Sequence, residues 1–128
     1  MLLTLLSGKI HRATVTEACV DYEGSISIDE NLLIAAGIRA YERVEVYNVT
    51  TGARFATYAI VAKPGSGTIG INGAAARLAT PNDLVIIAAY AQMTPEEADR
   101  HQPRLVFVDK ANAIKERRHV ETPSTITV

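Results

Sequence analysis

The pattern of apolar and polar residues predicts a protein of many short β-strands, because the apolar residues either alternate with polar ones or form short runs rich in β-branched side chains. Residues 2–19 fit an extended conformation, and the consecutive β-branched residues Thr14, Val15 and Thr16 favour a strand there. Further strands are expected over residues 25–28, 41–49, 53–62, 68–71, 84–89 and 104–108. Residues 84–89 are apolar throughout, so this strand should be covered on both faces.

Two short helices and several turns separate the expected strands. Asp29 is typical of an N-cap and Gly37 of a residue that ends a helix, so residues 30–36 should be helical. A capping box that starts at Thr94, with Pro95 at the first helical position, predicts a second short helix. Turns are expected at residues 50–52, 63–67, 72–73 and 80–83, and residues 74–77 form one helical turn at most.

A chain of 128 residues is one domain by its length. Many short strands with small helices favour an all-β barrel or sandwich. The character of the chain changes after Asp109, where Lys and Arg residues stand among few large apolar ones. We therefore expect a domain over residues 1–109 and a C-terminal tail over residues 110–128 that is solvated or partly disordered.

The composition argues against several functional classes. A formal net charge of −1 gives no electrostatic basis for binding nucleic acid or an anionic membrane. The single cysteine, Cys19, excludes an intramolecular disulfide, and the three histidines lack the spacing of metal ligands, so no metal site is expected. No apolar run reaches the ~18 residues of a membrane helix, and we expect a soluble cytoplasmic protein.

One peptide bond, between Gly24 and Ser25, offers chemistry of its own. Glycine reaches backbone angles that a Cβ forbids, and a serine hydroxyl next to it could attack the glycine carbonyl if the fold strained the bond. The alternative is a plain turn between two strands, which the dipeptide alone favours. The same pair of residues, Gly65-Ser66, stands in an expected loop later in the chain.

The surroundings of this bond resemble a known family, the bacterial aspartate 1-decarboxylases, in order and spacing from about residue 1 to residue 108. The matching blocks are Lys9-Ile10-His11-Arg12, Tyr22-Glu23-Gly24-Ser25 with Ile26 and Ile28, Arg54-Phe55-Ala56-Thr57-Tyr58-Ala59-Ile60, and Asn72-Gly73-Ala74-Ala75-Ala76. The resemblance implies a six-stranded double-psi β-barrel. It also implies that the precursor cuts itself between Gly24 and Ser25 and that Ser25 becomes a covalent pyruvoyl group.

The activity that the resemblance implies is decarboxylation of L-aspartate to β-alanine and carbon dioxide, for the synthesis of pantothenate and coenzyme A. The substrate amine would form a Schiff base with the pyruvoyl group, which acts as an electron sink that no side chain can replace. Family members are tetramers with active sites between subunits, so a homotetramer is expected. The rival interpretation is a small β-barrel binding or structural module in which the Gly24-Ser25 bond stays intact.

Two neighbouring residues match the family's processing and catalytic positions. Thr57 corresponds to the donor that stabilises the oxyanion during cleavage and also contacts substrate, whereas Tyr58 corresponds to the proton donor of the reaction. Adjacent residues face opposite sides of an ideal strand, so both reach one site only if the strand bends or subunits share the site. The alternative for Thr57 is an ordinary strand residue without a functional role. The alternative for Tyr58 is an aromatic side chain of the core.

The remaining matches are substrate-binding positions. Arg54 is suited to clamp a carboxylate with its planar fork, and the alternative is a solvated hairpin residue. Lys9 and His11 share one strand face, which alone would indicate a solvated face. The family's substrate-binding turn is matched by Asn72, Gly73, Ala74 and Ala75.

Two positions depart from the family's pattern. Asp21 stands close to the cleavage site where members often carry His, which bears on self-processing, and Arg77 stands beside the substrate turn where His is common, which bears on affinity.

Overall fold

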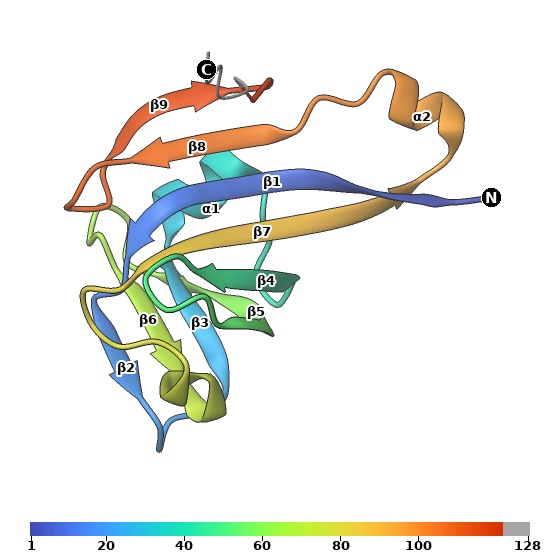
Figure 1. Cartoon of the computed structure of the whole chain (residues 1–128). Coiled ribbons are helices and arrows are strands. Elements are labelled where there is room, and N and C mark those ends of the chain that lie inside the picture. The colour runs from blue at the N-terminus through green and yellow to red at the C-terminus, as the bar shows by residue number, and fades with distance from the viewer. Residues whose placement is uncertain (122–128) are drawn as a thin grey trace, which may run out of the picture.

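Nine β-strands lie side by side in one continuous sheet in the computed structural model, which describes residues 1–121 (Figure 1). The strands are β1 (Leu3–Thr14), β2 (Glu17–Cys19), β3 (Ser25–Asp29), β4 (Arg43–Asn48), β5 (Arg54–Ala62), β6 (Ile69–Asn72), β7 (Leu84–Met93), β8 (Arg104–Val108) and β9 (Ile114–Arg118). Three short helices join them: α1 (Glu30–Ala36), the 3-10 helix η1 (Gly73–Arg77) and α2 (Pro95–Asp99). The predicted mainly-β class is confirmed.

The strand order mixes parallel and antiparallel neighbours. Along the sheet it runs β2-β6-β3-β5-β4-β7-β1-β8-β9. The pairs β1/β8, β2/β6 and β3/β5 are parallel, whereas the remaining pairs are antiparallel. Because parallel strands need crossover connections, segments that are distant in sequence become neighbours. The start of β3 is thereby placed between β5 and β6.

The core is a cluster of buried β-branched and aliphatic side chains. Ile26 and Ile28 of β3 and Ile69 and Ile71 of β6 are fully buried, and they interlock where these two strands pair. Helix α1 adds Leu32 and Leu33 to the same cluster. Each such side chain contributes roughly 1.5–3 kcal/mol by leaving water, so the strands that carry the cleavage region are firmly anchored.

Asp29 links helix α1 to a distant loop. Its carboxylate caps α1 by accepting from Asn31 N at 2.9 Å, as the sequence predicts. It also accepts from Gly65 N and Gly67 N, at 3.1 and 2.9 Å. The loop before β6 is thus tied to the end of β3, and this fixes the pairing of β3 with β6.

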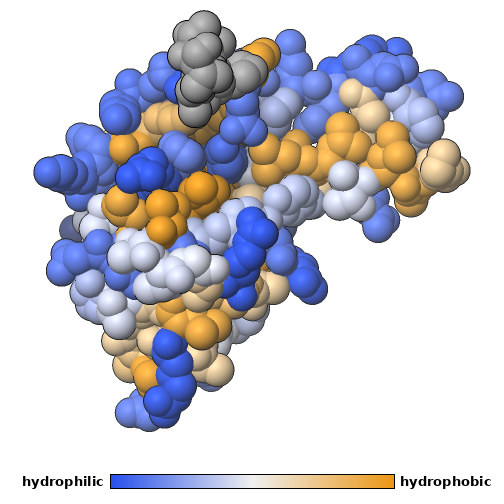
Figure 2. All heavy atoms as spheres, in the orientation of Figure 1, coloured by the Kyte–Doolittle hydropathy of each residue, from blue (hydrophilic) through white to orange (hydrophobic). Residues whose placement is uncertain are grey.

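A two-stranded arm projects from the body of the molecule, formed by the N-terminal half of β1 and the C-terminal half of β7 (Figure 1). Hydrophobic residues gather along this arm on the face that Figure 2 shows. Met1, Leu2 and Leu3 are exposed there. No helix among residues 1–121 is long and apolar enough to cross a membrane.

Three predictions about the elements need correction. The extended stretch at residues 2–19 is two strands, because the chain turns after Thr14 and Val15 N donates to Asp83 O. The apolar strand at 84–89 continues to Met93 in the arm, and Ile86 is only half-buried. Residues 104–108 are not the last strand, because β9 follows antiparallel to β8. Of the expected tail, residues 122–128 lie outside the described part.

Candidate active site

The Gly24-Ser25 peptide bond crosses from the surface into the protein interior. Ser25 is the first residue of β3 and only 2% exposed, whereas Gly24 before it is exposed. Ser25 is therefore held by the strand ladder, while the residue that carries the carbonyl lies in the connection from β2. This arrangement places a buried hydroxyl beside a peptide bond at the end of an ordered strand.

Asn72 fixes the hydroxyl of Ser25. The two residues are register partners in the antiparallel β3/β6 ladder, so their side chains share one face of the sheet. Asn72 Nδ2 donates to Ser25 Oγ and to Ser27 Oγ, both at 3.0 Å, and Ser25 Oγ donates to the carbonyl of Glu23 at 3.3 Å. The hydroxyl thus has a defined orientation before any reaction.

A pocket of about 400 Å³ opens directly on Ser25. Its lining residues are Tyr22, Glu23, Ser25, Ala40, Tyr41, Tyr58, Ile60 and Val61. Tyr58 reaches it because Ile26 pairs with Ala59 in the parallel β3/β5 ladder, which places Ser25 alongside Tyr58 on the neighbouring strand. The pocket combines a nucleophile, a phenol and apolar walls in a space suited to a small metabolite.

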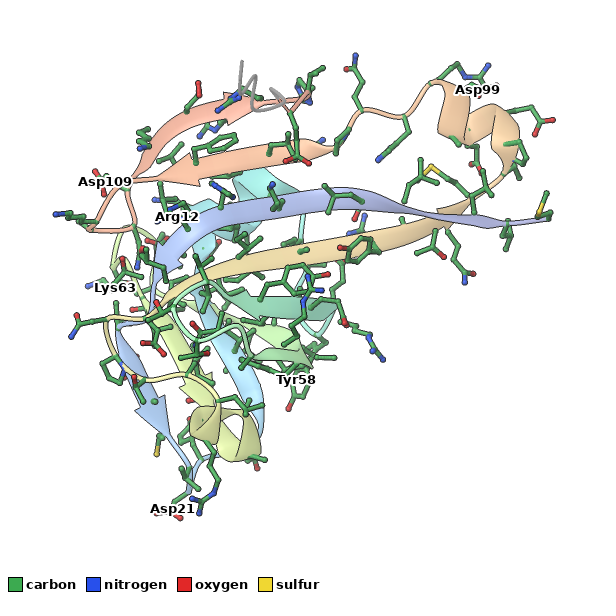
Figure 3. All side chains as sticks on the ribbon, in the orientation of Figure 1. Arg12, Asp21, Tyr58, Lys63, Asp99 and Asp109 are labelled. Carbon is green, nitrogen blue, oxygen red and sulfur yellow. The ribbon has the colours of Figure 1, made fainter. Side chains whose placement is uncertain are left out.

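Tyr58 is a pocket residue and not a core aromatic. Its side chain is 38% exposed and points away from the sheet in Figure 3. The ring of Tyr41 lies 6.3 Å from that of Tyr58, centroid to centroid, and Tyr41 has a positive φ of 68°. That backbone conformation is uncommon outside glycine, and no pattern in the sequence indicated that Tyr41 belongs to the pocket.

Thr57 lies on the opposite face of β5 from Tyr58. The β4/β5 ladder pairs Val44 with Thr57 and Arg43 with Tyr58 in unbroken register, so the side chains alternate as in a regular strand. Thr57 is half-buried and does not line the pocket at Ser25. Within one chain the expected oxyanion donor and proton donor are therefore on different faces.

Arg54 also lies outside the pocket within one chain. Arg54 stands four positions before Tyr58 on β5, which corresponds to about 13 Å along the strand. Its guanidinium stacks over the ring of Tyr47, 4.1 Å from the centroid. Tyr47 in turn shares a hydrogen bond of 2.7 Å with Tyr90 between their hydroxyls.

The Tyr47–Tyr90 pair is a feature that the sequence did not reveal. Burial, followed by the hydrogen bond to Tyr47, raises the pKa of Tyr90 to about 12. Tyr90 therefore stays protonated near neutral pH and can act as a hydrogen-bond donor. Because the two residues come from different strands, β4 and β7, only the strand pairing brings them together.

Lys9 and His11 occupy one side of β1, three places from β5 in the order of the sheet. Lys9 Nζ forms an ion pair of 2.7 Å with Glu121. His11 packs against Phe107 with ring centroids 5.2 Å apart, and its Nδ1 is buried without a hydrogen-bond partner among the described residues. Neither residue lines the pocket at Ser25.

The environment of His11 makes stability depend on pH. Burial, followed by the charges of Lys9 and Arg12, lowers the pKa of His11 below its ordinary 6.5, while Glu121 partly opposes this shift. The folded state then holds His11 neutral as the unfolded chain gains a proton, so stability falls as the pH drops below that value. The free energy of unfolding of the parent chain, measured by urea titration, should therefore be lower at about pH 5 than at about pH 7.5, and His11→Gln should make this difference smaller. An equal loss in parent and variant would contradict the prediction.

The Asn72–Ala75 turn begins next to the cleavage region. Asn72 ends β6 in an extended conformation, and Gly73, with a positive φ of 73°, starts η1, so the change of direction expected here is present but the short helix begins one residue earlier than predicted and runs over Gly73–Arg77. The first backbone N–H groups of such a turn have no partner within it and can face an anion. The two residues that depart from the family's pattern, Asp21 and Arg77, are both exposed, and Figure 3 shows Asp21 at the tip of the β2–β3 connection.

One chain thus brings together part of the predicted site. Ser25 and Tyr58 line the pocket, Asn72 donates a hydrogen bond to Ser25, and Gly73 packs against Gly24. The residues placed elsewhere are Lys9, His11, Arg54 and Thr57.

Comparison with known proteins gives a consistent result. The family model described as aspartate decarboxylase matches residues 1–115. The chain is 59% identical over 115 residues to the aspartate 1-decarboxylase of Caulobacter vibrioides, covering 90% of this chain and 98% of that protein. It is 58% identical over 121 residues to the aspartate 1-decarboxylase of Ruminiclostridium cellulolyticum, with 94% of each chain covered. It is 60% identical over 114 residues to aspartate 1-decarboxylase 1 of Gloeobacter violaceus, covering 89% of this chain and 97% of that protein.

Proposed function

This chain belongs to the aspartate decarboxylase family and decarboxylates aspartate for pantothenate synthesis, and we propose that it does so through a pyruvoyl group made from its own Ser25. The observation that carries the proposal is the Ser25 hydroxyl, which belongs to a buried residue that lines the pocket and accepts a hydrogen bond from Asn72 Nδ2 at 3.0 Å. The side-chain amide of Asn72 fits a pyruvoyl group at this position, because an N–H₂ that donates to a hydroxyl can equally donate to a carbonyl oxygen.

Self-cleavage would begin at the hydroxyl that Asn72 holds. Ser25 Oγ attacks the carbonyl carbon of Gly24, the new C–O bond forms as the C–N bond breaks, and the proton passes from Oγ to the Ser25 nitrogen. Transfer of the Ser25 α-proton to solvent water then expels the Gly24 carboxylate and leaves dehydroalanine. Addition of water to the dehydroalanine then gives the pyruvoyl group and releases ammonia.

A pyruvoyl group supplies the carbonyl that condenses with the substrate amine and accepts the electron pair freed when carbon dioxide leaves. The chain's own residues then have defined tasks. Tyr58, whose phenol lies in the same pocket, donates a proton to the carbon that lost the carboxylate. The half-buried side chain of Ile60 adds an apolar wall to the pocket beside the reacting groups.

The residues that lie far from Ser25 favour a site shared between subunits. Arg54 and Lys9 are separated from the pocket along the strand and across the sheet, yet both are suited to bind substrate carboxylates. A second copy supplying them would complete the site. We therefore propose a homotetramer with active sites between subunits, in which Arg54, Lys9, His11 and Thr57 act alongside Ser25, Tyr58, Asn72, Gly73, Ala74 and Ala75.

The finer description of the fold belongs to the same proposal. A six-stranded double-psi β-barrel over residues 1–109 is supported by the parallel crossover pairs β1/β8 and β3/β5. The boundary of the C-terminal tail at residue 110 stays a prediction. Membership of a biosynthetic family supports a cytoplasmic enzyme whose ligand is L-aspartate, without nucleic acid or membrane partners.

Intact mass tests the proposal directly. The purified parent chain should give two fragments, one covering residues 1–24 and a remainder that begins at modified Ser25. A single mass for the full chain, together with no release of β-alanine from aspartate, would favour the rival of an intact β-barrel module. Appearance of β-alanine from an uncut chain would retain the activity and overturn the pyruvoyl route.

Arg54→Ala should lower kcat/KM for aspartate about 30-fold or more, the ~2 kcal/mol or more that loss of one charged partner typically costs. We assign Arg54 to the retained side-chain carboxylate. A cation on the leaving α-carboxylate would stabilise a charge that disperses in the transition state, and would oppose catalysis. Arg54→Lys should be costly as well, because it loses the two-pronged geometry. Arg43→Ala, which removes an exposed cation from neighbouring β4, is the matched control and should change little.

Mixed assemblies test whether Arg54 acts across subunits. Arg54→Ala chains co-assembled with Ser25→Ala chains should regain activity, because a site can then combine an intact Ser25 with an intact Arg54. No recovery in a verified mixed assembly would place Arg54 within its own chain. A structure with a non-decarboxylating analogue in which Arg54 contacts the α-carboxylate would refute the carboxylate assignment and leave the pyruvoyl route standing.

A further inference from the structure

Gly73 packs directly against the backbone of Gly24. A Cβ placed on Gly73 would lie 2.6 Å from Gly24 Cα, 2.9 Å from Gly24 N and 3.3 Å from the carbonyl oxygen of Tyr22. All three are backbone atoms, which cannot rotate away as the end of a side chain can. Since carbon contacts ordinarily lie at ~3.5–4.0 Å, a side chain here would displace Gly24 by roughly 1 Å.

The lack of a side chain is required at Gly73 and not at Gly24 itself. A Cβ on Gly24 would meet nothing within 4 Å, and Gly24 does not adopt a positive φ. Gly24 therefore does not use, in this structure, the wider range of backbone angles that glycine offers. The backbone of Gly24 can approach this closely only because Gly73, which follows the last residue of β6, has no side chain.

The dipeptide Asn72-Gly73 thus contacts both reacting partners. Asn72 Nδ2 donates to the Ser25 hydroxyl, and the α-carbon of Gly73 admits the backbone of the residue whose carbonyl is attacked. We infer that Gly73 is a positioning residue for self-cleavage, which sets the distance between the Gly24 carbonyl and Ser25 Oγ. The inference rests on the proposed conversion of Ser25 and assigns Gly73 a task separate from substrate binding.

The expected size of the effect follows from the displacement. A shift of about 1 Å in reacting groups can cost about 10²-fold in rate. Replacing Gly73 should therefore slow cleavage by roughly 10- to 100-fold while the fold persists. The second consequence of a replacement is strain from the positive φ of 73°, and the experiment must separate it from the clash.

Asparagine makes that separation, because it tolerates a left-handed backbone but carries a Cβ. The test variant is Gly73→Asn and the matched control is Gly65→Asn. Gly65 has a similar φ of 79°, but its Cβ would meet only Asn31 Nδ2 at 4.0 Å. Cleavage is followed in freshly prepared chain by intact mass over time. The melting temperature is measured for each change in the uncut Ser25→Ala background.

We expect Gly73→Asn to accumulate uncut chain and Gly65→Asn to cleave at the parent rate, with similar melting temperatures for the two. Equal cleavage rates in Gly73→Asn and parent would overturn the inference, as would equal slowing in both variants. Failure of both Gly73→Asn and Gly73→Ala to fold would also overturn it, because Gly73 would then serve the fold. If the parent chain itself never cleaves, the proposed function fails first, so the two failures are distinguishable.

Discussion

Ser25→Ala should leave a single uncut chain of 128 residues without decarboxylase activity. Alanine lacks the oxygen that attacks Gly24, so neither the ester nor the pyruvoyl group can form. The fold should survive, because Asn72 Nδ2 keeps its hydrogen bond to Ser27 Oγ at 3.0 Å. The substitution removes the hydrogen bonds that the Ser25 hydroxyl makes with Asn72 Nδ2 and Glu23 O, and each loss should lower the free energy of unfolding by about 0.5–1.5 kcal/mol.

The chain carries its own control for this substitution. Gly65-Ser66 is the same dipeptide, placed in an exposed loop where Ser66 Oγ donates to Thr68 Oγ1 at 2.8 Å. Ser66→Ala should therefore cleave fully and retain activity. Mass spectrometry that found normal cleavage and a pyruvoyl terminus in the Ser25→Ala protein would refute the mechanism.

Local chemistry explains why much of the fold could be predicted. Asp29 and Gly37 begin and end α1 as expected, because capping depends on residues adjacent in sequence. The capping box at Thr94 is likewise present in full. Strand β9 was missed because four of its five residues are charged, and an edge strand held by backbone bonds to β8 shows no apolar alternation.

The candidate site depends on long-range pairing, which sequence patterns do not encode. Ser25 meets Asn72 and Tyr58 only because β6 and β5 flank β3. The family resemblance indicated which residues belong to the site. It did not indicate which of them lie together within one chain and which lie outside the pocket. The contact of Gly73 with Gly24 was equally invisible, since a turn signal explains Asn72-Gly73 without any neighbour.

Tyr58→Phe is expected to leave self-cleavage intact and to lower the turnover number by ~10²–10⁴-fold, the usual contribution of a positioned general acid. Cleavage should proceed because Ser25 Oγ keeps its hydrogen bonds to Asn72 and Glu23, neither of which involves Tyr58. Stability should change little, because Tyr58 is 38% exposed and its ring, which contacts Tyr41, is retained. Single-turnover assays on fully processed protein measure the chemical step without contributions from incomplete maturation.

Tyr41→Phe provides the matched control in the same pocket. It removes one phenolic hydroxyl and keeps a ring 6.3 Å from that of Tyr58, so any general loss of polarity in the pocket affects both variants. If Tyr58 is the proton donor, only Tyr58→Phe should slow the chemical step, and KM should change less than kcat because the phenol acts mainly in the transition state. Equal rates for Tyr58→Phe and parent would assign the proton to another donor, and equal slowing in both variants would indicate that pocket polarity matters instead.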